Sequence, residues 1–355
     1  MGDGRRAVEG VVLDPAAWAG RRVLITGHTG FKGGWLALWL AALGAEVTGF
    51  AEPAAEPSFF GLAGIDADVR SRIGDVRDAA AVARVVADAR PEVVLHLAAQ
   101  PLVRASYEDP AATYAVNVMG TVNVLDAVRA AAPGVRSVVV VTSDKCYANR
   151  EWEWGYREDE PLGGRDPYSS SKAAQEIVAA AYRDSYDLPI ATARAGNVIG
   201  GGDFGADRIV PDAVRAAVAG EPLRVRNPDA IRPWQHVLAP LHGYGLLAER
   251  AATGAWNFGP AEADARPVRE LVDRLAAAWD GGLTWAADPG DHPHEAHFLK
   301  LDSSRARTRL GWAPAWDLEQ GVAATAEWYR AWRRGGDVRA LALEQIDAYG
   351  RGASR

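Results

Sequence analysis

A β-strand, a glycine-rich turn and an apolar helix follow one another in RVLITGHTGFKGGWLALWLAALG, residues 22–44. Three glycines in the turn, Gly27, Gly30 and Gly33, are spaced three residues apart. This spacing allows a tight turn, a close approach of the backbone to a pyrophosphate, and close packing of the helix on the strand. Because the helix N-terminus then faces the phosphates, these residues predict a dinucleotide-binding unit rather than a purely structural turn.

Strand-like and helix-like segments continue to alternate up to residue 195. We expect strands at residues 22–26, 46–50, 69–73, 93–97, 136–141 and 190–194. We expect helices at residues 35–43, 78–89 and 111–132, and a further helix after Pro167. Such alternation is typical of a parallel sheet covered by helices on both faces, with its ligand at the carboxyl ends of the strands. The predicted fold class is therefore α/β, with a Rossmann-type, doubly wound parallel sheet over residues 21–195.

The periodicity is less regular after residue 195. Short β-like pieces are mixed there with helical patterns, at residues 223–226, 237–249, 256–258, 267–279 and 318–332. This mixture predicts a smaller, discontinuous α/β substrate domain, mainly residues 196–334 and interleaved with the first domain. Residues 1–20 are expected to form a polar lead-in, and residues 335–355 a C-terminal tail that starts as a possible helix.

Composition and charge narrow the class of protein. The 355-residue chain has a formal net charge of −7 and scattered basic residues, which argues against nucleic acid and anionic membrane surfaces as partners. No apolar run approaches the roughly 20 residues of a membrane span, and the N-terminus lacks the apolar core of a signal peptide. The single cysteine, Cys146, excludes an internal disulfide and fits a reducing compartment, so we expect a cytoplasmic location.

Two polar clusters fall at the predicted carboxyl edge of the sheet. Ser143, Asp144 and Lys145 follow the fifth strand, and Tyr168 and Lys172 lie one turn apart on the next helix. The positive charge of a lysine favours the phenolate form of a neighbouring tyrosine, which can then accept a proton near neutral pH. The tyrosine and the lysine together predict a base.

These residues carry a resemblance to a known family. The phosphate-binding turn, the Tyr168–Lys172 spacing and Ser143 resemble the extended short-chain dehydrogenase/reductase family of nucleotide-sugar enzymes. Four further stretches are similar to the CDP-glucose branch of its 4,6-dehydratases: TSDKCY (142–147), GGRDPY (163–168), RAGNVIGGGD (194–203) and RPWQHV (232–237).

The resemblance implies a reaction in three stages on one bound sugar nucleotide, CDP-glucose in that branch. The sugar is oxidised at C4, water is eliminated across C5 and C6, and the hydride returns to C6, which gives a 4-keto-6-deoxy sugar. Tyr168, positioned by Lys172 and Ser143, would take the proton of the C4 hydroxyl. Asp144 would protonate the leaving C6 hydroxyl.

Lys145 stands where the dTDP-glucose relatives have a glutamate as the C5 base. A lysine acts as a base only when it is neutral, so its pKa would have to fall through burial or nearby positive charge. The sequence therefore leaves two roles open for Lys145: taking the C5 proton, or pairing with Asp144 or a phosphate.

The cofactor implied by the resemblance is NAD. The implied contacts are Gly27, Thr29, Gly30, Phe31, Lys32, Gly33, Asp75, Val76, Ala98, Ala99 and Gln100, together with Tyr168 and Lys172. Asp75 is equally placed to serve only as a helix N-terminal turn residue. The second strand lacks the usual ribose-binding aspartate, and Glu52 is the candidate in its place, so the choice between NAD and NADP stays open. His28 and Lys32 add polar bulk and charge beside the phosphate turn.

The second half of the chain is expected to recognise the substrate. The resemblance implies that Asn197, Arg208 and Arg232 face its diphosphate, because guanidinium groups match phosphate oxygens. It also implies a homodimer formed by helices 111–132 and 175–186, although these helices are equally suited to covering the sheet.

Other functions remain open from the sequence. A nucleotide-sugar 4-epimerase would share Tyr168 and Lys172 but would not need Asp144 and Lys145, and a dehydratase for another nucleotide-linked hexose would need all four. A cofactor-binding regulator would not need a proton acceptor at all. The loop at residues 291–297 contains three histidines and two carboxylates, but no further ligand group supports a metal, and we expect none.

Overall fold

The computed structural model describes residues 12–131, 134–290 and 298–353, and its centre is a seven-stranded sheet in the order β11-β6-β5-β4-β1-β2-β3. All neighbouring strands in this sheet are parallel. The strands are β1 (Arg22–Thr26), β2 (Glu46–Ala51), β3 (Arg70–Ile73), β4 (Val93–His96), β5 (Ser137–Val141), β6 (Ile190–Ala195) and β11 (Gly254–Phe258). The predicted Rossmann-type sheet is confirmed.

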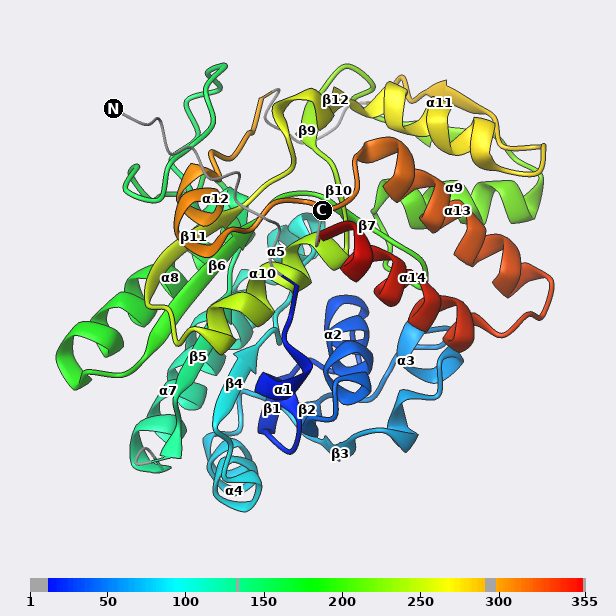
Figure 1. The fold of residues 1–355 in the computed structure, drawn as a ribbon. Coiled ribbons are helices and arrows are strands. Elements are labelled where there is room, and N and C mark those ends of the chain that lie inside the picture. Colours follow the sequence, from blue (N-terminus) through cyan, green and yellow to red (C-terminus); the bar gives the residue numbers. More distant parts are fainter. Residues whose placement is uncertain (1–11, 132–133, 291–297, 354–355) are drawn as a thin grey trace, which may run out of the picture.

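Helices cover both faces of the sheet, as alternation of buried residues along the strands requires. In β1, Leu24 packs into one apolar cluster, while Val23 and Ile25 pack into the other. The first cluster is covered by α4 (Ala79–Ala89), α7 (Gly120–Ala131) and α8 (Pro167–Tyr186). The second is covered by α1 (Pro15–Trp18), α2 (Phe31–Ala42), α10 (Leu238–Glu249) and α14 (Val338–Ala353). Figure 1 shows α7 and α8 side by side on the left and α2 near the middle of the picture.

A smaller group of elements lies beyond the carboxyl ends of the strands, at the upper right of Figure 1. Its helices are α9 (Ile209–Ala219), α11 (Val268–Ala278) and α13 (Leu318–Arg333). Short strand pairs accompany them: β7 (Val198–Ile199) with β10 (Gln235–His236), β8 (Leu223–Val225) with β13 (Trp285–Ala287), and β9 (Ile231–Pro233) with β12 (Ala265–Pro267). We refer to these elements as the small domain.

Short helices complete the connections between these elements. They are α3 (Phe59–Leu62), α5 (Val103–Glu108), α6 (Pro110–Tyr114) and α12 (Ser304–Leu310), with 3-10 turns at Ile65–Ala67, Asp144–Cys146 and Glu262–Asp264. No helix in the described part of the chain is long and apolar enough to span a membrane.

Three features differ from the sequence-based expectations. The piece expected at residues 256–258 is β11, which adds to the main sheet by pairing with β6. The helix expected at 111–132 is interrupted by a π-helical turn, Ala115–Met119, between α6 and α7. The C-terminal segment forms α14, a helix that extends to Ala353 and buries Tyr349 against the second cluster, so this stretch is packed against the domain rather than free.

Candidate active site

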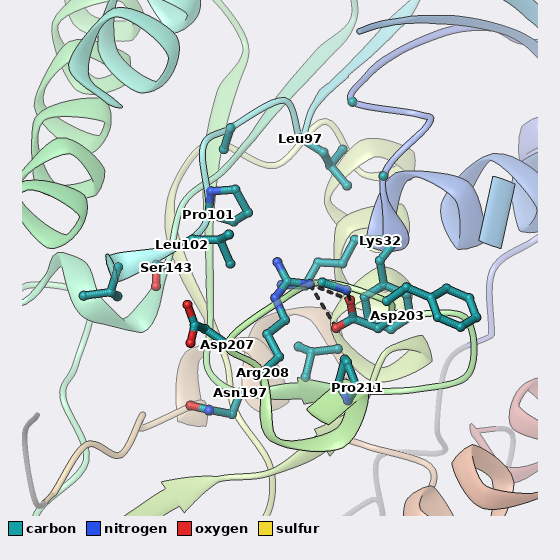
Figure 2. Close-up of a pocket in the computed structure, with 18 of the residues that line it drawn as sticks. Lys32, Leu97, Pro101, Leu102, Ser143, Asn197, Asp203, Asp207, Arg208 and Pro211 are labelled. Carbon is teal, nitrogen blue, oxygen red and sulfur yellow. Dashed lines mark hydrogen bonds and ion pairs between the residues drawn. The ribbon is translucent and has the colours of Figure 1, made fainter. Parts of the chain in front are cut away.

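A cleft of about 870 Å³ opens between the carboxyl ends of the sheet and the small domain. Figure 2 shows that its wall combines Ser143 and the loop around Pro101 from the main domain with Asn197, Asp207 and Arg208 from the small domain. The predicted site residues that line it are Gly27, Thr29, Gly30, Phe31, Lys32, Gly33, Asp75, Val76, Ala98, Ala99, Ser143, Asp144, Lys145, Tyr168, Lys172, Asn197, Arg208 and Arg232. The fold thus brings residues from distant parts of the sequence to one cavity.

Gln100 is the predicted cofactor residue that the structure places outside this lining. Its main-chain N–H donates to Asn117 Oδ1 at 2.8 Å, and its side-chain amide donates to Thr113 Oγ1 at 2.9 Å. Both partners belong to the helical segment after the loop. Gln100 therefore fixes the loop that follows β4 instead of facing the cleft.

The turn after β1 has the close backbone contacts that a phosphate-binding turn needs. A Cβ atom on Gly27 would lie 2.8 Å from the backbone nitrogen of Ala98, and one on Gly33 would lie 2.0 Å from the carbonyl oxygen of Gly27. Gly30 is the N-cap of α2, and no side chain caps this helix end. Because the first N–H groups of α2 lack a side-chain acceptor, this part of the cleft fits the pyrophosphate of a dinucleotide.

Residues that come after β2 and β3 in the chain form another part of the proposed cofactor region. Asp75 and Val76 line the cleft there, and Asp75 forms an ion pair with Arg77 at 2.5 Å. Hydrogen bonding from Arg77 lowers the pKa of Asp75. Glu52, the candidate ribose residue, also lines the cleft, and lies 3.5 Å from Arg77.

His28 does not line the cleft, although we expected it to add polar bulk and charge beside the phosphate turn. Its ring is buried behind the turn, where it would collide with any Cβ on Gly49, and its Nε2 is 2.7 Å from Ser71 Oγ. Burial lowers the pKa of His28 to about 4. The histidine is therefore a neutral packing residue between the turn and the adjacent strands.

Lys32 does lie at the cleft, in a group with Arg208 and Asp203 (Figure 2). Arg208 Nη1 contacts both carboxylate oxygens of Asp203, at 2.8 and 2.9 Å. Burial and the positive charge of Arg208 lower the pKa of Lys32 to about 8. Asp203 ends the GGGD stretch quoted above, and its position five residues before Arg208 was the sequence signal for a pair that we did not predict.

Tyr168 and Lys172 are positioned by the start of α8. Asp166 caps this helix by accepting from Ser169 N at 2.8 Å, and Pro167 occupies its first turn. The main-chain N–H of Tyr168 donates to Ser106 Oγ at 3.1 Å. Lys172 Nζ donates to the carbonyl oxygen of Val141.

The pKa of Tyr168 differs from the sequence-based expectation. We expected Lys172 to favour the phenolate, but burial raises the pKa of Tyr168 to about 12, against the opposing effect of the Ser143 hydroxyl. Burial and the positive charge of Lys32 lower the pKa of Lys172 to about 7. The reason is that both groups are buried, so desolvation penalises both charged forms. Tyr168 is therefore a neutral phenol in this structure.

Asp144 is buried at the end of β5, with 3% of its surface exposed. Its Oδ1 accepts from Ser143 Oγ at 3.0 Å, while its buried Oδ2 has no hydrogen-bond partner within the residues that the structure describes. Burial raises the pKa of Asp144, against the opposing charge of Lys145. These features favour a protonated carboxyl group that has one oxygen available to a ligand in the cleft.

Lys145 is half-buried beside the Asp144 carboxyl group, and its Nζ lies 5.9 Å from the centre of the Tyr168 ring.

Trp234 lines the cleft and donates its indole N–H to Arg266 O at 3.0 Å. His236 is buried against Trp35 and Trp316 instead. The 291–297 loop, for which we expect no metal, lies outside the described residues.

The sequence pattern did not reveal two other polar groups. Arg104 Nη1 and Asp207 Oδ1, which come from opposite walls of the cleft, lie 3.1 Å apart. Glu176 is buried one turn after Lys172 on α8. Only the fact that Glu176 is four residues from Lys172 could have pointed to it.

The chain is similar to known proteins over nearly its whole length. The model of the family described as GDP-mannose 4,6 dehydratase matches residues 24–325. The CDP-glucose 4,6-dehydratase of Salmonella typhimurium is 48% identical over 354 residues, which cover 95% of this chain and 98% of that protein. The dTDP-glucose 4,6-dehydratase of Xanthomonas campestris pv. campestris is 30% identical over 92% of this chain and 98% of that protein. The solved dTDP-glucose 4,6-dehydratase of Streptomyces venezuelae, with NAD bound, gives a TM-score of 0.77 at 26% identity, over 90% of this chain and 99% of that one.

Proposed function

This chain belongs to the GDP-mannose 4,6-dehydratase family, and from that membership we propose that it converts CDP-D-glucose to CDP-4-keto-6-deoxy-D-glucose. The CDP-glucose 4,6-dehydratase described above supports this choice of substrate. The reaction oxidises C4, eliminates water across C5 and C6, and returns hydride to C6. The chain is then an NAD-dependent hydro-lyase with no net change in its cofactor.

The glycine turn and the uncapped N-terminus of α2 would hold the pyrophosphate of NAD. Asp75, Val76, Ala98 and Ala99 line the neighbouring part of the cleft, where the adenosine half would lie. NAD, when bound, supplies the hydride acceptor at C4 and the hydride donor at C6. The comparison structure with NAD bound supports NAD as the cofactor.

In this proposal Tyr168 takes the proton of the C4 hydroxyl as the phenolate, so the neutral phenol must first lose its own proton to solvent. The interaction with Ser143 favours the phenolate. Lys172, one turn further along α8, supplies positive charge while it remains protonated. Because the pKa of Lys172 is about 7, its charge state changes near neutral pH.

Asp144 is the residue that best supports the elimination of water, because it is suited to act as the acid. Hydroxide is a poor leaving group, so the oxygen of the C6 hydroxyl must receive a proton as the C–O bond breaks. A buried carboxyl with a raised pKa and an oxygen free of hydrogen bonds in the described chain is suited to give that proton. We propose that Lys145, in its neutral form, takes the C5 proton, because it lines the cleft and lies near the Tyr168 ring.

The small-domain wall would hold the substrate nucleotide. Asn197, Arg208 and Arg232 line this wall, and we assign the diphosphate to them. Asp203 already fixes the guanidinium of Arg208, so this side chain is oriented before the substrate arrives.

A nucleotide-sugar 4-epimerase is the second candidate function. It would use Tyr168 and the same cofactor site, but it moves no water and needs no acid at C6. The buried Asp144 therefore favours the dehydratase. A dehydratase for another nucleotide-linked hexose would use the same catalytic groups and would differ only in the nucleotide that it binds.

We also propose a homodimer that buries the outer surfaces of α7 and α8. Large apolar side chains are exposed on α8 and on the π-helical turn that precedes α7: Ile177 at 60% and Met119 at 51%. Exposed large apolar side chains are typical of a subunit interface. A cytoplasmic location remains our proposal on the strength of the single cysteine, Cys146, which is free and buried.

A substrate panel tests the proposed function. The purified protein is incubated with NAD and, separately, with the CDP, dTDP, UDP and GDP derivatives of glucose, and the products are weighed by mass spectrometry. We expect loss of one water from CDP-glucose and little change in the others. An unchanged mass with an isomerised sugar would favour the epimerase, and water loss from a different nucleotide sugar would correct the substrate.

A further inference from the structure

Glu176 is a buried carboxylate that lies on α8 outside the lining of the cleft. It is 3% exposed and follows Lys172 by one helical turn. Its Oε1 accepts a hydrogen bond from the hydroxyl of Thr142. Its Oε2 accepts from Thr192 Oγ1 at 2.6 Å and from Arg194 Nη2 at 2.7 Å. A buried charge is retained only when it is well paired, and these donors meet that requirement.

The hydrogen bond from Thr142 connects Glu176 to the reacting groups. Thr142 directly precedes Ser143 and Asp144 in the chain. One residue earlier, Val141 O accepts from Lys172 Nζ at 3.3 Å. Two side chains of α8, one turn apart, therefore hold two consecutive residues at the end of β5.

The other partners of Glu176 come from the rigid frame of the sheet. Thr192 and Arg194 lie two residues apart on β6, so their side chains point to the same face. Arg194 Nη1 donates to Tyr147 Oη at 2.7 Å, and that hydroxyl donates to Asn257 Oδ1 in β11, also at 2.7 Å. Hydrogen bonds therefore hold the Glu176 carboxylate to β6 directly and, through Arg194 and Tyr147, to the neighbouring strand β11.

We propose that Glu176 is a positioning residue, which through Thr142 sets the separation between the strand end carrying Ser143 and Asp144 and the helix carrying Tyr168 and Lys172. The proposal rests on the proposed function in assigning chemistry to those four groups. Glu176 itself lies outside the lining of the cleft, so it would contact neither substrate nor cofactor. It acts by holding the acid and the tyrosine in register, and misplacement by about 1 Å can cost a factor on the order of 100 in rate.

Thr142→Val and Thr142→Ser form the matched test. Valine keeps the shape of threonine and removes its hydroxyl, whereas serine keeps the hydroxyl and removes a methyl group. We expect Thr142→Val to lower kcat by at least about tenfold with KM little changed, and Thr142→Ser to recover most of the wild-type kcat. The direct change, Glu176→Gln, leaves the buried Arg194 without its carboxylate and can unfold the chain, so it is the secondary variant.

Thr192→Val is the control for a purely structural role. It removes another donor to the same carboxylate, but on β6, away from Ser143 and Asp144. We expect it to lower the melting temperature about as much as Thr142→Val while keeping kcat within about twofold of wild type. Equal kcat losses in the two valine variants, a wild-type kcat in Thr142→Val, or no recovery in Thr142→Ser would each overturn the proposal.

A crystal structure of Thr142→Val separates this proposal from the proposed function. We expect Ser143 Oγ to move relative to the Tyr168 hydroxyl in Thr142→Val and to stay in place in Thr142→Ser and Thr192→Val. If the wild-type protein turns over no nucleotide sugar, the proposed function fails, and this displacement still decides the positioning role. An unmoved Ser143 in Thr142→Val would contradict it.

Discussion

Lys172 Nζ lies 3.3 Å from the carbonyl oxygen of Val141, the last residue of β5. This contact buries the ammonium group between the helix and the sheet, where 3% of the residue is exposed. Burial and the charge of Lys32 lower the pKa of Lys172 from 10.5 to about 7. Burial of Lys172 beside the catalytic groups therefore lowers the free energy of unfolding of the protein near neutral pH.

Lys172→Met should reveal this cost through its dependence on pH. Between about pH 7 and pH 10 the unfolded chain binds the lysine proton and the folded chain does not, so the wild type becomes more stable as pH rises. We expect Lys172→Met to exceed the wild type in unfolding free energy near pH 7 and to lose on the order of 4 kcal/mol of that advantage by pH 10. Urea unfolding at several pH values measures the difference, and a difference that does not vary with pH would contradict the lowered pKa.

Tyr168→Phe should abolish oxidation at C4. The change removes the phenolic hydroxyl and keeps the ring, so we expect a loss of roughly 10²–10⁴-fold in the first step. Single-turnover absorbance of the reduced nicotinamide measures that step. Tyr244→Phe is the matched control, because Tyr244 is buried outside the cleft, and it should keep the wild-type rate. Comparable losses in both variants would point to a general packing defect.

Exchange of the C5 proton with solvent tests whether Lys145 or Lys32 is the base that removes it. Both amines line the cleft and act on Asp144 by charge, but Lys145 lies near the Tyr168 ring. In D₂O the wild type should place deuterium at C5 of the product or of recovered ketone. We expect Lys145→Met to lose this exchange by at least about 100-fold and Lys32→Met to retain it. The reverse result would assign the base to Lys32, whose pKa of about 8 gives it a neutral fraction at pH 7.

Ile177→Lys should convert the proposed dimer to a monomer. Ile177 is 60% exposed on α8, among the apolar side chains of the proposed interface, and a buried lysine there would be desolvated without a partner. Light scattering after size-exclusion chromatography measures the mass. Val218→Lys is a matched change at an exposed apolar residue of α9, on the small domain, and it should leave the mass unchanged. A monomeric wild type would contradict the proposal.

Local patterns in the sequence were sufficient to predict much of this site. The Gly27 to Gly33 spacing defines a turn between a strand and a helix that are adjacent in the chain. Tyr168 and Lys172 lie together because they are four residues apart on one helix. Strand alternation likewise places Ser143 and Asp144 at the carboxyl edge of the sheet. The curated relative at 48% identity supports the same assignment of reaction.

Features that depend on contacts distant in the chain were not predicted. β11 joins the main sheet because Phe258 pairs in register with Ala195, which no local pattern encodes. The raised pKa of Tyr168 reflects its burial in the folded chain. The proposed role of Glu176 depends on the hydrogen bond that it accepts from Thr142, which lies 34 residues earlier.

Asp144→Asn in a single turnover with CDP-glucose and NAD tests the central claim most directly. Tyr168 remains intact in this variant, so oxidation at C4 should proceed and the absorbance of the reduced nicotinamide should build up and persist. Mass spectrometry of the quenched sugar should then show no loss of water, while the wild type returns to its starting absorbance with one water lost. Water loss by Asp144→Asn at the wild-type rate would contradict the assignment of Asp144 as the acid.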